Sequence, residues 1–139
     1  MMIIDEITDI LNDSKNLKIL GDRLNSLYDE FRDGRDPNDI VKLLTNSNEK
    51  LVWQGCNICC EIIVNNSHYS NILINELLNI LENNESSRNR ERAFDALYGF
   101  YMDIKDIEGF KKNCERYKND SNIEISFSCN NFFLQERTK

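Results

Sequence analysis

Apolar residues recur along this chain at spacings of three and four, which places them on one face of a helix. In residues 48–63 this stripe consists of Val52, Cys56, Cys59, Cys60 and Ile63. The pattern predicts an amphipathic helix whose buried face carries three cysteines.

The same spacing returns in three other parts of the chain, about 32 residues earlier and then about 37 and 73 residues later. The matching sets are Leu20, Leu24, Leu27, Tyr28 and Phe31; Asn89, Ala93, Ala96, Leu97 and Phe100; and Ile125, Cys129, Phe132, Phe133 and Glu136. A shorter apolar segment precedes each stripe, with Ile7, Ile10 and Leu11; Ile40, Leu43 and Leu44; Leu77, Ile80 and Leu81; and Cys114 and Tyr117. Such self-similarity predicts four helix–turn–helix units in one domain spanning residues 1–139.

Residues 122–135 fit two different structures. Ile123, Ile125, Phe127 and Cys129 alternate with polar residues, which would suit a strand in a β-hairpin turning at residues 130–131. The repeat register instead makes this segment the second helix of the fourth unit. Ser121, followed by Glu124 three residues later, fits a capping box. We therefore expect a helix at 122–135, with the hairpin as the less favoured alternative.

The stretch "DPNDIVKLLTNSNEKLVWQGCNICCEIIVN" (residues 36–65) resembles a HEAT-like repeat. Asp36 is placed to cap its first helix, which would begin at Pro37. The second helix carries a small residue where the two helices of a unit are expected to approach, at Cys56. Ala93 and Cys129 are the counterparts in later units, and only Arg90 fills the position where such repeats usually have arginine. The resemblance implies an all-α, small right-handed α-solenoid, whose curved surface usually binds another macromolecule.

The composition narrows the possible partners. The chain has 139 residues and a formal net charge of −7, which argues against binding nucleic acid or an anionic membrane and allows a basic protein partner. The first ten residues lack a basic segment followed by an apolar run, so we expect no signal peptide. No apolar stretch reaches the roughly 18 residues of a membrane helix. The five cysteines are then expected to be reduced thiols in a cytoplasmic protein.

No residue in the sequence stands out as catalytic. Cys56, Cys59 and Cys60 have a spacing that could suit a metal, but they share the apolar stripe, where thiols act as small hydrophobic groups. The single histidine, His68, has no nucleophile placed beside it. We therefore expect no cofactor and no metal, and a structural role for the cysteines.

Three groups of residues are candidates for binding a partner, each with packing or solvation as the alternative. Trp53 lies off the buried stripe, as a binding anchor would. Glu61, Phe94, Tyr98 and Tyr101 lie on the neighbouring ridge of the second-helix layer. The third group is an acidic cluster at the end of the first unit, expected near Trp53, and it comprises Asp29, Glu30, Asp33, Asp36 and Asp39.

These features predict a non-enzymatic protein-binding module. Compact acidic bacterial proteins built from such repeats resemble immunity proteins, which bind and block a cognate toxin. If that toxin is a nuclease, its active site would be basic and an acidic inhibitor could cover it. A scaffold or adaptor in a larger assembly is the first alternative, and an enzyme with a carboxylate or thiol site is the second. The identity of the partner and the oligomeric state stay open.

Overall fold

The computed structural model describes residues 2–62 and 67–137, and these fold into helices without strands. The helices are α1 (Ile3–Asp13), α2 (Leu17–Arg32), α3 (Asn38–Leu44), α4 (Glu49–Glu61), α5 (Ser67–Asn83), α6 (Ser87–Asp103), α7 (Ile107–Tyr117) and α8 (Ile123–Arg137). The all-α prediction is confirmed. So is a helix over residues 122–135, and the β-hairpin alternative is wrong.

The first turn of α8 is capped by a residue that the sequence analysis did not select. Asn122 Oδ1 accepts a hydrogen bond from the Ile125 amide at 3.1 Å, and Asp120 Oδ1 accepts one from the Asn122 amide at 2.8 Å. The predicted capping box of Ser121 and Glu124 is therefore wrong by one residue. Ile125 and Cys129 are buried and hold α8 against its neighbours.

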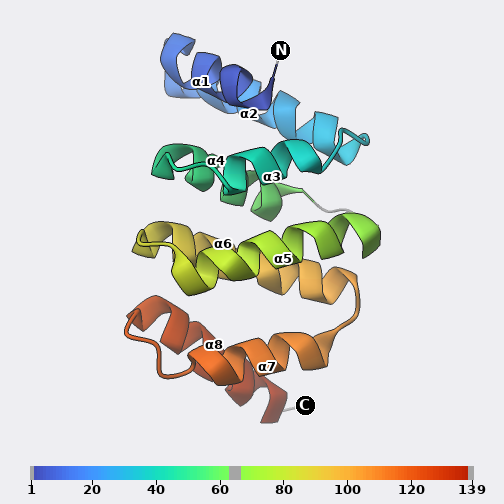
Figure 1. Cartoon of the computed structure of the whole chain (residues 1–139), viewed down its shortest axis with the longest axis vertical. Coiled ribbons are helices and arrows are strands. Elements are labelled where there is room, and N and C mark those ends of the chain that lie inside the picture. The colour runs from blue at the N-terminus through green and yellow to red at the C-terminus, as the bar shows by residue number, and fades with distance from the viewer. Residues whose placement is uncertain (1, 63–66, 138–139) are drawn as a thin grey trace.

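The helices are arranged as four successive pairs along the long axis of the molecule, from α1 and α2 to α7 and α8 (Figure 1). Each odd-numbered helix contacts the even-numbered helix that follows it. Contacts also join neighbouring pairs: α3 touches α1 and α5, and α6 touches α4 and α8. Side chains in the middle pairs are thus enclosed by helices on both sides.

The core follows the predicted stripes closely. In the first helices of the pairs, the apolar positions singled out from the sequence are buried, apart from Leu11, which is partly buried. In α6 the whole predicted stripe is buried, including Asn89, whose side chain donates to the Glu49 carbonyl at 3.1 Å. Some stripe positions are only partly buried, namely Leu20, Leu24, Cys60, Phe132 and Phe133, while Ile63 lies outside the described residues.

The start of α3 lies one residue later than the sequence indicates. The helix begins at Asn38, and Pro37 precedes it in a helical conformation. Asp36 still supplies the capping bond, because its Oδ1 accepts from the Asn38 amide at 2.9 Å. Gly34, with φ +112°, makes the preceding turn in a conformation that favours glycine.

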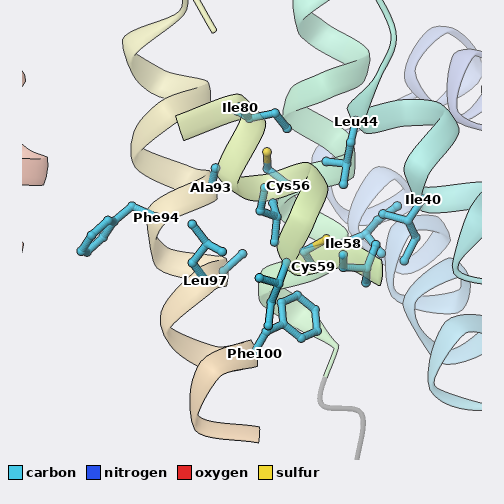
Figure 2. Close-up of a cluster of buried hydrophobic side chains, with 14 of the residues drawn as sticks. Ile40, Leu44, Cys56, Ile58, Cys59, Ile80, Ala93, Phe94, Leu97 and Phe100 are labelled. Atoms are coloured by element: carbon cyan, nitrogen blue, oxygen red, sulfur yellow. The ribbon is translucent and has the colours of Figure 1, made fainter. Parts of the chain in front are cut away.

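The close approach of α3 and α4 is at Gly55 rather than at Cys56. A Cβ built on Gly55 would lie 2.9 Å from Leu44 Cδ2 and 3.0 Å from Leu43 Cβ. Cys56 instead faces α6, with its Sγ 4.0 Å from the Asn89 carbonyl oxygen. In Figure 2 the sulfur of Cys56 points toward Ile80, and Ala93 of α6 lies to its left. The small side chains at Cys56 and Ala93 therefore bring α4 close to α6, so the expected role of Cys56 within its own helix pair is corrected.

Arg90 links three elements across two helix pairs. Its Nε donates to the Leu81 carbonyl at 2.7 Å, near the end of α5. Its two terminal nitrogens bind both carboxylate oxygens of Asp120, at 3.1 and 2.7 Å, in the turn before α8. This two-pronged geometry is a strong form of ion pair, and Arg90 holds Asp120 largely buried.

Among the described residues, no helix combines the length and the apolar character needed to cross a membrane.

Candidate protein-binding surface

An aromatic cluster joins the last two helix pairs, with the ring of Phe110 at its centre. The Phe110 ring centroid lies 5.6 Å from that of Phe94, 5.2 Å from Tyr98 and 5.9 Å from Tyr101. Phe132 of α8 meets it edge-on at 5.0 Å. These separations are typical of favourable aromatic pairs, so the cluster fixes α7 and α8 onto α6.

Most of the aromatic ridge predicted from the sequence is used for this packing. Phe94 and Tyr101 are buried, and Figure 2 shows Phe94 pointing away from the core side chains Leu97 and Phe100 on the same helix. Tyr98 remains 49% exposed, and Phe127 of α8 is 67% exposed. Of the predicted ridge, Tyr98 is the aromatic residue with substantial surface for a partner.

Tyr98 and Phe127 border a groove of about 330 Å³ between α6 and α8. Buried or partly buried rings of Phe94, Phe110 and Phe132 line it, and its polar lining comprises Asp95, Ser128, Asn131 and Gln135. A smaller hollow of about 110 Å³ adjoins it and includes Glu91, Asp95 and Glu124. The surface therefore combines aromatic rings with carboxylates.

These carboxylates are weakly neutralised by the chain itself. The nearest ion pair of Asp95 is with Arg92 at 3.9 Å. No arginine or lysine among the described residues lies within ion-pair distance of Glu91 or Glu124, although Glu91 accepts a hydrogen bond from Asn122 at 3.0 Å. Partial desolvation raises the pKa of Asp95, opposed by the charge of Arg92 and reinforced by Glu91. The groove thus holds negative charge that a cation would stabilise.

The acidic cluster at the end of the first pair is partly paired within the chain. Arg35 Nη1 lies 2.7 Å from Glu6 and 3.6 Å from Glu30, and its Nε donates to Asp39 at 3.0 Å. The guanidinium also lies over the Phe31 ring, 5.2 Å from its centroid. Burial alone would raise the pKa of Asp39, but the hydrogen bonds and charges of Arg35 and Lys42 together outweigh this and lower it.

Other members of the acidic cluster keep more accessible carboxylates. Asp29 pairs with Arg32 at 2.8 Å while remaining exposed, and Asp33 and Asp36 are exposed on the turn that leads to α3. Exposed pairs of this kind contribute little to stability. Asp29, Asp33 and Asp36 therefore face solvent with negative charge, as does Glu30, which is 59% exposed at 3.6 Å from Arg35.

Trp53 and the acidic cluster lie at opposite ends of α4. Trp53 is in the first half of the helix, half-buried, and Arg88 at the start of α6 lies 3.7 Å from its ring centroid. Arg32, which pairs with Asp29, donates to the carbonyl of Glu61 at the other end of α4. The structure therefore does not bring Trp53 beside Asp29–Asp39 as expected, and Arg88 covers one face of the indole.

Glu61 belongs to a polar network on the even-numbered helices. Its carboxylate lies 3.5 Å from Arg92, and Arg92 Nε donates to Asn57 at 2.8 Å. Burial raises the pKa of the nearby Tyr28, and the charge of Glu61 adds to this. Glu61 is exposed, so its carboxylate adds negative charge to the surface of the even-numbered helices although it is paired with Arg92.

The cysteines are free thiols in apolar surroundings. Burial raises the pKa of Cys56 to about 12 and that of Cys60 to about 11, so both stay protonated near neutral pH. A hydrogen bond with Cys129 and burial raise the pKa of Cys114. Within residues 2–62 and 67–137, no group of three or more His, Cys, Asp or Glu is placed to hold a metal ion. His68 is exposed in the first turn of α5.

The sequence analysis missed Phe127, Asp95 and Glu124 as surface residues of one groove. Phe127 was available from the repeat register, because it matches Gln54 and Glu91, which lie off the buried stripes. No local pattern in the sequence indicates that α6 and α8 lie side by side and form a groove. Comparisons of the chain with protein-family models, with curated proteins and with solved structures found no match.

Proposed function

We propose that this chain is a small right-handed HEAT-like α-solenoid that binds a basic protein, and that it acts as an immunity protein blocking a toxin domain. The stacked helix pairs and their regular apolar stripes support the solenoid assignment. The observation that carries the binding function is the groove between α6 and α8, where Tyr98 and Phe127 are exposed beside carboxylates. Large aromatic side chains left at a surface are typical of interaction sites.

Charge supports a basic partner. The chain carries a net charge of −7, and the exposed carboxylates of Asp29, Asp33 and Asp36 add a second negative area to that of the groove. Opposite potentials speed the association of two proteins, whereas buried contacts mainly set how slowly they separate. In this proposal the acidic cluster attracts the partner and the groove retains it.

The test begins with the partner. The chain is purified from its native host with bound proteins, and the product of any adjacent gene that encodes a basic domain is tested for direct binding. Co-expression then asks whether the chain protects cells from that domain. Protection together with tight binding supports the proposal, whereas a neutral or acidic partner or an absence of protection contradicts the immunity assignment.

Binding kinetics at two salt concentrations test the role of charge. Asp33→Lys with Asp36→Lys should lower the association rate and flatten its salt dependence. Glu76→Lys with Glu108→Lys, on the odd-numbered helices α5 and α7, changes the net charge by the same amount and is the matched control. Equal effects of the two double variants would show that only net charge matters, and would remove the acidic cluster from the binding surface.

A scaffold role is the second candidate, favoured by α8. This helix exposes Ile123 at 80% and Leu134 at 57%, in addition to Phe127. Apolar residues on several faces of one helix suit contacts with more than one neighbour. Stable association with two different proteins at once, measured by light scattering of the purified complex, would favour the scaffold over a toxin inhibitor.

A further inference from the structure

Arg35 and Arg116 each contact an aromatic ring and a carboxylate, and Arg35 is the less exposed of the two. Arg35 lies over the Phe31 ring and pairs with Glu6 and Asp39, at 2.7 and 3.0 Å. The Arg35 side chain is only 15% exposed there, so this combination accommodates an arginine largely away from water. It shows which groups this protein uses around a desolvated guanidinium.

The groove between α6 and α8 offers the same groups with no arginine of the chain among its lining residues. Tyr98 and Phe127 supply accessible ring surface, and Asp95 lies between them and the hollow lined by Glu91 and Glu124. Ser128 and Asn131 add side-chain oxygens that can accept hydrogen bonds.

We infer that this groove receives an arginine side chain of the basic protein partner, an inference that rests on the proposed function. A guanidinium is attracted to aromatic faces, and its planar set of N–H donors matches carboxylate and amide oxygens. The groove is open enough, at about 330 Å³, for a side chain to enter from solvent.

Two other occupants fit the groove less well. A purely apolar side chain would cover Asp95 and its neighbouring carboxylates without pairing them, which is unfavourable for charged groups. A lysine would satisfy one carboxylate but lacks the flat surface that stacks on a ring. The mixed lining therefore favours arginine over both.

The first experiment uses a small probe and the whole chain. N-acetyl-arginine amide is titrated into isotope-labelled protein and followed by NMR, with N-acetyl-citrulline amide as the neutral probe of nearly the same shape. Arginine should shift the amide signals of Tyr98, Phe127 and Asn131 and saturate, and citrulline should bind at least threefold more weakly. Equal binding of the two probes, no saturable shift at the groove, or shifts centred on residues 29–39 would overturn the inference.

Variants identify the groups responsible. Phe127→Ala and Asp95→Asn should each weaken the arginine probe about threefold or more. Both side chains are largely accessible, so the fold should persist, which circular dichroism verifies. Asp33→Asn makes the same charge change in the acidic cluster and should leave probe binding unchanged. If Asp95→Asn and Asp33→Asn weaken the probe equally, only net charge matters and the groove has no specific role.

The two proposals fail in distinguishable ways. A basic partner that binds Phe127→Ala and Asp95→Asn as tightly as the unmodified chain would refute the arginine site and leave the proposed function standing. A groove that binds the arginine probe specifically, in a chain that binds no basic protein, would refute the proposed function and leave the arginine site.

Discussion

Replacing Gly55 by alanine tests the contact between α3 and α4. The added Cβ would lie 2.9 Å from Leu44 Cδ2 and 3.0 Å from Leu43 Cβ, whereas ordinary contacts begin at 3.4 Å. The Leu44 methyl group can rotate away. Leu43 Cβ is attached directly to the backbone, so relief there requires α3 itself to move by a few tenths of an ångström.

The expected magnitude follows from two opposing effects. Overpacking of this kind costs about 1–3 kcal/mol. Alanine in place of glycine inside a helix raises the free energy of unfolding by about 0.5–1 kcal/mol. Gly55→Ala should therefore lower the free energy of unfolding by about 1 kcal/mol.

Gly99→Ala is the matched control, because it also lies inside a helix and a Cβ there meets nothing within 4 Å. Gly99→Ala should raise stability by about 0.5–1 kcal/mol. The difference between the two variants removes the common helix effect and isolates the contact, at about 1–3 kcal/mol. Urea unfolding followed by circular dichroism measures both values, and thermal midpoints should separate by about 4 °C per kcal/mol at this chain length. If Gly55→Ala is stabilised as much as Gly99→Ala, α3 and α4 do not approach as the structure shows.

Three further changes test other contacts. Cys56→Leu should cost about 1–3 kcal/mol by overpacking α4 against α6, and Cys56→Ala should cost less; equal unfolding midpoints would contradict this. Arg90→Ala should lower the free energy of unfolding in urea by about 2 kcal/mol, because Asp120 and the Leu81 carbonyl lose their arginine partner. The control Arg88→Ala removes a surface stack on Trp53 and should lower it by under about 1 kcal/mol. The hydrogen bond from Arg90 lowers the pKa of Asp120 below its ordinary value of 3.8. The stability gained over Asp120→Asn should therefore be constant above about pH 5 and shrink as pH falls through the lowered pKa, and a gain that grows on acidification would refute this.

The helices and their buried faces could be predicted because each depends on local spacing. Ile40, Leu43 and Leu44 repeat at positions that only a helix brings together, and all three are buried. The helix at residues 122–135 was harder to predict, since α8 has apolar residues on several faces. The alternation of apolar and polar residues there would suit a β-strand, whereas the comparison with the other units correctly predicted a helix.

The partners of each helix face could not be predicted in the same way. Cys56 and Gly55 are adjacent, and both are small, so the sequence does not show which one meets α3 and which meets α6. That choice depends on the angle between helices, which is set by side chains from several units together. The same limit explains why Trp53 and the acidic cluster were expected to be neighbours although α4 separates them.

The candidate site depends on a property that is even harder to predict from local sequence: which carboxylates have an arginine or lysine of the same chain beside them in the fold. Arg35 forms ion pairs with both Glu6 and Asp39 and neutralises them. No arginine pairs in this way with the groove carboxylates, which are Glu91, Asp95 and Glu124. In the sequence both sets are simply acidic residues near aromatic ones. Once folded, the first set stabilises the helix pair and the second remains available to a charge from outside. A partner that supplies an arginine would thus complete at the α6–α8 groove the arrangement that Arg35 already completes within the chain.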